Sequence, residues 1–505
     1  MSYIQGQCRA QQTLFPSSLD EYIAAENPVR VIDEYINGLN MCELGFAKAV
    51  PAATGRPPYS PSHLLKLALY CYMIRVRSSR RQMAECQRNV EAMWLLEKLV
   101  PDHRTIARFR SENALAMKNV FRDFTKLCLR LNLYGKELAA IDGSKFAAVN
   151  SLDKNFNDAK LKDRIARIDR QIAEYMQLLD TEDAKEESVE EKSAEEIREI
   201  ISGLKDRKET YEGYSEELKS TGSRQKSLTD PDSRRMKDKD TSDMCYNTQI
   251  SVDSKNKLIG DFSATNAAND KNQLSDLAKS TAEVLEADSL SVVADTGYDN
   301  ATEIAECLMA GITPHVAGVD YDMCIPANED EPIEDITEHH NGKCVYIKDR
   351  NVAICPMGKV LYPKSYINSE GKASFSNSAA CANCSCRCGD RPRPKEYRFV
   401  MPKGDFTKEY NDDELRVKQV RVVADKETVR LRKTLVEHPF GTIKRNMDAG
   451  YLLTKGITKV TGELALTFLA YNFKRVINIL GTNGLMDAVR CRLFSPLFRF
   501  SYFVA

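Results

Sequence analysis

The sequence lacks a membrane-spanning run, a signal peptide and any sizeable net charge. Its two most apolar stretches, residues 64–73 and 464–480, are too short, or too interrupted by Asn472, Lys474 and Arg475, to cross a bilayer. We therefore expect both stretches to be core helices, and we expect no membrane partner. No N-terminal segment has the basic, apolar and small-residue order of a signal peptide, which predicts a cytoplasmic location.

The formal net charge of −1 conceals an uneven distribution of charged residues. Arg is concentrated in residues 75–110, Lys and Arg flank Glu437, and acidic residues dominate 180–196. Nucleic-acid binding requires a basic face rather than a basic whole. The near-zero net charge therefore does not exclude a nucleic-acid partner.

Cysteine is present in a pattern that argues against a disulfide framework. The 505-residue chain has 15 cysteines and no secretory signal, so free thiols and a metal site are expected. A C-x2-C pair and a Cys-Pro-Met-Gly turn predict a structural zinc site with four thiolates, Cys355, Cys381, Cys384 and Cys388. Cys386 is the surplus member. The alternative is a set of reduced thiols without a metal.

Residues 1–130 are expected to be helical and to bind DNA. A helix that begins at His103 has one apolar face, formed by Ile106, Phe109, Asn113, Met117, Val120 and Phe124. Arg104, Arg108 and Arg110 then point elsewhere. Arg104 and Arg108 lie one turn apart, which suits phosphates or a guanine edge in a helix-turn-helix-like unit. The alternative is a solvated basic face.

Residues 150–240 contain two charged segments with heptad spacing of apolar residues. The first carries Leu161, Ile165, Ile168, Ile172, Tyr175 and Leu179, and the second carries Ile197, Ile201, Leu204, Tyr211 and Leu218. The pattern predicts an antiparallel helical hairpin inserted into another domain. The alternative is a solvated charged helix without a partner.

The rest of the chain predicts an α/β fold. The order strand, hairpin, helix, strand and helix between residues 245 and 310 favours a mixed sheet covered by helices. Asn269 or Asp270 caps the first of these helices. A segment rich in Gly, Pro and Cys, residues 320–405, interrupts the pattern, and a long helical region follows.

Three acidic residues occupy unusual settings. Asp142 and Asp295 each end a short apolar run, LAAID and LSVVAD, and Glu437 lies in a basic helical stretch. Burying a carboxylate is costly unless it is paired or binds a cation. Three such groups beside Lys and Arg suggest divalent metals that handle phosphate oxygens. For each acid alone, the alternative is a helix cap or a surface ion pair.

The segments IDGSKF, VVADTGYD and EHPFGTIK, in that order and after PDHRTIARFR, resemble the DDE transposases of bacterial insertion sequences. The resemblance implies a ribonuclease H-like mixed sheet with helices on both faces in residues 131–480. Within this domain, the heptad segments (150–240) and the cysteine-rich segment (320–405) are expected to be insertions, and residues 481–505 are expected to form a C-terminal tail. Asp142, Asp295 and Glu437 would then bind Mg²⁺ or Mn²⁺.

Basic residues around Glu437 match the family only in part. Lys444 stands where the family has Lys, whereas Lys433 replaces the usual Arg and Arg430 the usual Tyr. Lys444, together with Arg432 and Lys433, is expected to position phosphates. Pro439 predicts a kink, or a new helix start, directly after Glu437.

The resemblance implies a transposase that binds the terminal inverted repeats of its element, cleaves the ends and joins 3′-hydroxyls to target DNA. A homodimer is expected because two ends must meet, and a bacterial, nucleoid-associated location follows. One alternative is a ribonuclease H-like nuclease that cuts without joining. Another is a non-catalytic DNA-binding regulator derived from such an element.

Overall fold

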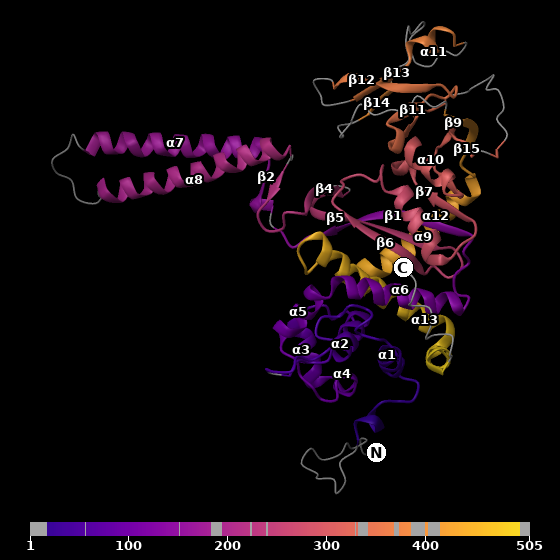
Figure 1. The fold of residues 1–505 in the computed structure, drawn as a ribbon. Helices are drawn as coiled ribbons and strands as arrows, with labels where there is room; N and C mark the ends of the chain where they lie inside the picture. Colours follow the sequence, from indigo (N-terminus) through magenta and orange to yellow (C-terminus); the bar gives the residue numbers. More distant parts are fainter. Residues whose placement is uncertain are drawn as a thin grey trace, which may run out of the picture.

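The computed structural model (Figure 1) describes most of the chain. The described residues are 18–55, 57–150, 152–182, 194–222, 225–238, 241–328, 330–331, 342–367, 373–384, 399–401 and 415–494. Within them, no helix combines the length and the apolar character needed to cross a membrane.

The described residues between 18 and 130 form helices that pack on α13 (Ile457–Phe494). After the short turn Leu19–Tyr22 come α1 (Pro28–Asn37), α2 (Pro61–Met73), α3 (Ser79–Arg88), α4 (Val90–Leu95), α5 (His103–Glu112) and α6 (Ala114–Arg130). Helix α13 (Ile457–Phe494) is interrupted at Gly481, whose φ is 72°. Both apolar stretches predicted to be core helices lie in this layer, in α2 and α13, and share one hydrophobic core.

The prediction that Ile106, Phe109, Asn113, Met117, Val120 and Phe124 form a buried face after His103 is confirmed, with one correction. All six of its residues are buried, although the helix breaks at Asn113 between α5 and α6. Arg110, expected to point away from the core, is buried as well. Its Nη1 donates to the Tyr72 hydroxyl at 3.3 Å and to the Arg77 carbonyl at 3.1 Å, which anchors the guanidinium inside the helical layer.

The predicted mixed sheet is present, in the order β4-β5-β1-β7-β8 with β6 on β5. Its strands are β1 (Leu138–Ala147), β4 (Arg234–Asp238), β5 (Thr241–Asp253), β6 (Ile259–Thr265), β7 (Leu290–Ala294) and β8 (Ile312–Val316). Strand β1 runs antiparallel to β5 and parallel to β7. Central β1 is therefore the strand on which the two halves of the sheet meet.

Helices cover both faces of this sheet because alternate residues of its strands point in opposite directions. Ala140 of β1 packs toward α12 (Lys426–Gly441), α13 and α6. Its neighbours Ala139 and Ile141 pack toward α9 (Leu274–Leu285) and α10 (Ala301–Met309). Helix α12 thus lies directly on the face that carries the even-numbered positions of β1.

The two heptad segments form a pair of helices, α7 (Asp158–Glu182) and α8 (Ala194–Thr221), which extend from the sheet as an arm (Figure 1). The arm begins at a two-stranded ladder, β2 (Asn155–Phe156) with β3 (Lys226–Ser227). The buried positions of its seam are Leu161, Ile168, Ile197, Ile201, Leu204 and Leu218. These are predicted heptad positions, so the arm satisfies its apolar residues internally.

The cysteine-rich segment contains a second sheet of five strands beyond β8. They are β10 (Val345–Ile347), β11 (Val352–Ile354), β12 (Val360–Ile367), β13 (Ala373–Ser376) and β14 (Phe399–Met401). The short helix α11 (Ser378–Ala382) lies between β13 and β14 in the sequence. Strands β9 (Asp320–Pro326) and β15 (Val417–Val423) form an antiparallel pair that leads into and out of this segment. Figure 1 shows it at the end of the molecule opposite the N-terminus.

A buried ion pair between Arg77 and Glu463 joins the N-terminal helices to α13 and provides a stability test. The side chains are 3% and 0% exposed, and their atoms approach to 2.7 Å. Replacing Glu463 with Gln should lower the free energy of unfolding by about 3–5 kcal/mol, because Arg77 then keeps a buried, uncompensated charge. Urea unfolding would measure the loss.

Lys162→Gln serves as the control for that test. Lys162 forms an exposed pair with Asp158 on the arm, and such pairs contribute about 0–1 kcal/mol. A Glu463→Gln loss no larger than that of Lys162→Gln would contradict the structural importance of the buried pair.

Candidate functional site

Asp142 lies on β1, and Asp295 follows directly after β7, the parallel strand beside it. The β1–β7 register pairs Ala140 with Val293, and two further residues along each strand bring Asp142 level with Asp295. Adjacent strands are about 4.8 Å apart, so two carboxylates at the same level share one small region. The structure thus brings together two of the three predicted acids.

Arg432 of α12 joins these two carboxylates. Its Nη1 lies 3.3 Å from Asp142 Oδ1 and 3.8 Å from Asp295 Oδ2. The Arg432 side chain is only 21% exposed. The sequence predicted a phosphate-positioning role for Arg432, whereas here its guanidinium is a counter-charge to the acids.

A third carboxylate, Asp270, lies at the same site and was predicted only as a possible helix cap. It accepts hydrogen bonds from Asn247 Nδ2 at 2.7 Å and Gln249 Nε2 at 2.6 Å, both on β5. A Cβ atom on Gly143 would come within 2.8 Å of Asp270 Oδ1. Asp270 therefore packs against the odd-numbered face of β1, opposite to the face that carries the Asp142 side chain, and acts on Asp142 only through its charge.

The surroundings of Asp142 raise its pKa. Burial raises the pKa of Asp142 to about 6, and the charges of Asp295 and Asp270 act in the same direction. The Arg432 guanidinium and the N–H of Gly143, 3.0 Å from Asp142 Oδ1, oppose that shift. Asp142 and Asp295 thus share one neighbouring cation, and Asp270 adds a further negative charge nearby, an excess of carboxylate that suits a divalent metal.

Glu437 does not join this cluster. Its side chain is 65% exposed, and its nearest charged partner is Lys433, at 3.8 Å. Glu437 follows Arg432 by five residues, which turns it about 140° around the helix axis. The described residues accordingly include no group of three His, Cys, Asp or Glu side chains that could hold a metal ion.

Pro439 lies inside α12 and starts no new helix. The irregularity comes later, at a π-helical turn formed by Thr442–Asn446. Lys444 in that turn donates from Nζ to the carbonyl of Lys145 at 2.7 Å and lies 4.9 Å from the ring centre of Phe146. The predicted basic residue is therefore held against β1, three residues beyond Asp142.

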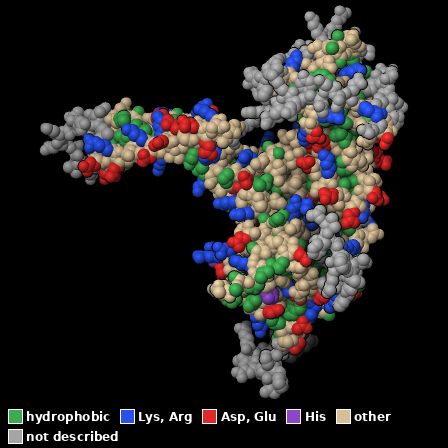
Figure 2. Space-filling model, viewed as in Figure 1, with side chains coloured by type: hydrophobic (Ala, Val, Ile, Leu, Met, Phe, Trp, Pro, Cys, Tyr) green, Lys and Arg blue, Asp and Glu red, His purple; other side chains and the backbone are tan. Residues whose placement is uncertain are grey.

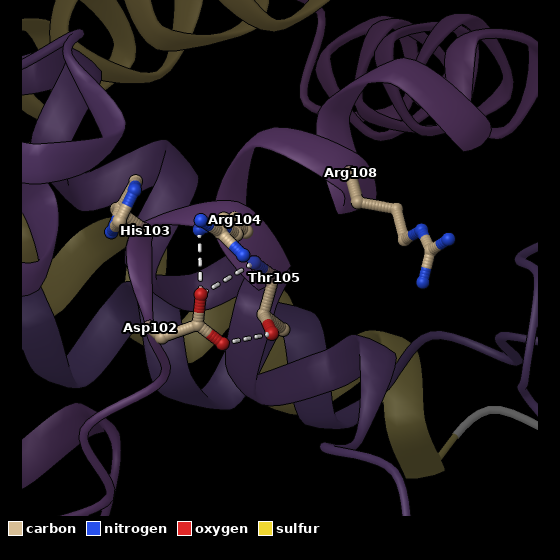
Figure 3. A pocket seen from close by; sticks show the side chains of 5 residues that line it. All are labelled: Asp102, His103, Arg104, Thr105 and Arg108. Atoms are coloured by element: carbon tan, nitrogen blue, oxygen red, sulfur yellow. Dashed lines mark hydrogen bonds between the residues drawn. The ribbon is translucent and has the colours of Figure 1, made fainter.

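Arg104 and Arg108 lie at the exposed start of α5 (Figure 3). Asp102 caps this helix by accepting hydrogen bonds from the backbone N–H groups of Arg104, at 2.7 Å, and Thr105, at 3.3 Å. Both arginines line an open pocket of about 700 Å³. Arg108 points away from the cap in Figure 3 and pairs with Glu112 at 3.0 Å. The predicted helix start is confirmed.

The pocket belongs to a basic edge of the molecule. Figure 2 shows Lys and Arg side chains along the edge below the arm of α7 and α8, where α5 lies in Figure 1. The Arg104 side chain is exposed, and Arg108 is 68% exposed. Both guanidinium groups can therefore reach a bound polyanion without rearrangement of the helical core.

Three of the predicted zinc ligands, Cys355, Cys381 and Cys384, are near enough to affect one another's charge, but the part of the chain that the structure describes does not group three thiols as a metal site would. Burial raises the pKa of the Cys355 thiol, and the neighbouring Cys384 and Cys381 thiols act in the same direction. The N–H of Lys359 donates to Cys355 Sγ at 3.3 Å, in a turn that places Gly358 at a φ of 71°. Cys386 and Cys388 lie outside the described residues.

Cys324 is a further thiol at this cluster that the sequence did not predict. Its thiol donates to the Pro356 carbonyl at 3.1 Å. Burial raises the pKa of Cys324 to about 12, and the nearby Cys355 adds to the shift. Cys324 is on β9, 31 residues before Cys355, so local cysteine spacing gave no signal for it.

Two family models match the sequence. Residues 17–112 match the transposase domain DUF772, and residues 354–477 match a transposase DDE domain. These matches support a DDE-type transposase. The second match includes Glu437 and Lys444 but begins after Asp142 and Asp295, so the assignment of the two aspartates depends on the geometry described above.

No curated protein matches the chain. One solved structure, a piggyBac transposase synaptic complex with hairpin DNA, is similar with a TM-score of 0.26 and 9% sequence identity. The similarity covers 93% of this chain and 82% of that chain. At this level it carries no argument about the site.

The thiol cluster predicts bound zinc. Protein purified without chelator should contain about one zinc per chain, because four-thiolate sites are saturated and structural. Cys384→Ser should remove most of it, as measured by elemental analysis. Cys42→Ser, at an exposed cysteine elsewhere, should leave the zinc content unchanged. Wild-type protein without zinc would contradict the site.

Proposed function

We propose that this transposase binds the terminal inverted repeats of a bacterial insertion sequence and performs metal-dependent strand cleavage and strand transfer. The observation that carries the proposal is the alignment of Asp142 on β1 with Asp295 at the end of the adjacent strand β7, with the partly buried Arg432 guanidinium between them. Asp270 adds a third negative charge. A site with this excess of carboxylate fits a divalent metal that handles phosphate oxygens.

The proposed architecture is a ribonuclease H-like catalytic domain in residues 131–480, preceded by a helical DNA-binding domain in 1–130 and followed by a tail in 481–505. The arm within 150–240 and the cysteine-rich segment within 320–405 are proposed insertions. The short ladder at the base of the arm and the strand pair β9–β15 support this division, because each brings the ends of its segment together. The active form is a proposed homodimer.

In the proposed reaction, Asp142 and Asp295 would hold Mg²⁺ or Mn²⁺, and Glu437, which is exposed and paired with Lys433 in this structure, would have to turn toward them to complete the site. The cations would activate the attacking oxygen and stabilise charge on the leaving oxygen. Lys444, fixed against β1, and the exposed Lys433 would hold phosphates of the DNA strand. Asn247 and Gln249 keep the Asp270 carboxylate in place beside the reacting groups.

A second candidate, a non-catalytic DNA-binding regulator, is favoured by one observation. Glu437 is exposed and paired with Lys433 rather than with the other acids. A nuclease that cuts without joining is a further alternative. Metal-dependent cleavage of end DNA would exclude the regulator, and joined products would exclude the simple nuclease.

The acids provide the direct test of the catalytic proposal. Asp142→Asn, Asp295→Asn and Glu437→Gln should each lower Mn²⁺-dependent cleavage of end DNA by more than about 100-fold. Loss of a residue that hydrogen-bonds to a metal ligand lowers activity by about 10–100-fold, and loss of the ligand itself should lower it further. DNA binding should persist in a gel-shift assay. Glu427→Gln, at an exposed acid in the first turn of α12, is the control and should retain cleavage. Near-normal cleavage by one of the three variants would remove that residue from the site.

The basic start of α5 provides a test of end recognition. Arg104→Ala and Arg108→Ala should weaken binding to the terminal repeat more than to random DNA, by about 1–3 kcal/mol for a base contact. Competition binding at fixed salt would measure both. Arg198→Ala, on exposed α8, should change neither. Equal losses on the two DNAs would indicate phosphate contacts only.

A further inference from the structure

The candidate metal site already has a cation of its own. A single nitrogen, Arg432 Nη1, lies between Asp142 Oδ1 and Asp295 Oδ2, at 3.3 and 3.8 Å. Among the residues that the structure describes, no other Lys or Arg forms an ion pair with either aspartate. The guanidinium therefore carries the whole direct charge compensation of the two strand-end carboxylates.

The helix fixes Arg432 in this place. Leu435 and Val436, three and four residues later, are buried in the core that α12 shares with the sheet. Residues at these spacings lie on one face of a helix, so Arg432 belongs to the face that packs on β1 and β7. The packing of Leu435 and Val436 against the sheet therefore directs the Arg432 side chain toward the two aspartates.

A divalent metal and the guanidinium cannot share this position. Asp142 and Asp295 would together hold the divalent cation, and the Arg432 guanidinium, which is also positive, already lies 3.3 and 3.8 Å from one oxygen of each. The metal and the guanidinium would therefore compete for the same two carboxylates.

We propose that Arg432 is a resident counter-cation that holds Asp142 and Asp295 together in the metal-free protein, and that a divalent metal binds by displacing it. This inference rests on the proposed function, because it assumes that the aspartates bind metal. Arg432 is then a positioning residue. Its displaced guanidinium would lie beside the metal, where a DNA phosphodiester is its natural partner.

Mn²⁺ binding to the DNA-free, full-length protein tests the displacement. Free Mn²⁺ can be counted by electron paramagnetic resonance. Arg432→Gln should bind Mn²⁺ more tightly than wild type, by a factor within the roughly 5–150-fold range of coupled sites. Arg430→Gln removes an exposed charge from the same helix and should bind like wild type.

Arg432→Lys separates displacement from simple charge repulsion. Lysine keeps the charge but has a shorter reach and no planar fork. Displacement of a bridge predicts Mn²⁺ affinity between those of wild type and Arg432→Gln. An affinity equal to wild type would mean that only the charge matters, and it would overturn the bridging role.

Thermal unfolding provides a second readout that a general packing defect would not reproduce. In EDTA, Arg432→Gln should melt below wild type, because the carboxylates lose their cation. Added Mn²⁺ should raise its melting temperature by more than it raises that of wild type. An equal Mn²⁺ response in the two proteins would overturn the proposal.

Asp142→Asn distinguishes failure of this inference from failure of the proposed function. If Asp142→Asn abolishes Mn²⁺ binding while Arg432→Gln binds no more tightly than wild type, the metal site stands and the counter-cation role is wrong. If Asp142→Asn binds Mn²⁺ as wild type does, or wild type and Arg432→Gln bind none, the metal site itself is wrong.

Discussion

The position of the candidate site depends on the ion pair between Arg77 and Glu463. Glu463 also accepts hydrogen bonds from the backbone N–H groups of Leu453, at 2.9 Å, and Thr454, at 2.9 Å. Arg77 donates to the carbonyls of Asp448 and Tyr451. The loop between α12 and α13 thus hydrogen-bonds to both members of the buried ion pair, its carbonyl groups to Arg77 and its N–H groups to Glu463.

The same loop also hydrogen-bonds to the central strand of the sheet. Ala147, the last residue of β1, donates to the Gly450 carbonyl at 3.1 Å and accepts from the Leu452 N–H at 2.7 Å. The end of β1 and the end of the α12 region are therefore fixed to each other. Because Arg432 reaches the acids from α12 and Lys444 reaches β1 from the π-turn, the geometry of the site follows from contacts made outside it.

Sequence patterns predicted what depends on local periodicity and missed what depends on long-range contact. Asp142 and Asp295 were found because each ends a short apolar run. Asp270 was missed as a site residue because its amide partners lie on β5, more than 20 residues earlier. Arg110 could not be recognised as buried, since its acceptors come from another helix and a loop. Glu437 points to solvent because Leu435 and Val436 turn the opposite face of α12 toward the sheet, and these long-range packing contacts have no local sequence signal.

The π-helical turn at Thr442–Asn446 gives the α12 segment one residue more than regular helix requires. Met447 N–H bonds to the Thr442 carbonyl, five residues back, at 2.9 Å. If the π-helical turn lay between Arg432 and Glu437 instead, every residue from the turn to its present position would move back by one helical position. The length of the chain between Arg432 and Met447 would stay the same. Glu437 would then occupy the present place of Val436, one turn from Arg432 on the buried face. The chain length is therefore compatible with a second register, in which a further carboxylate faces the sheet.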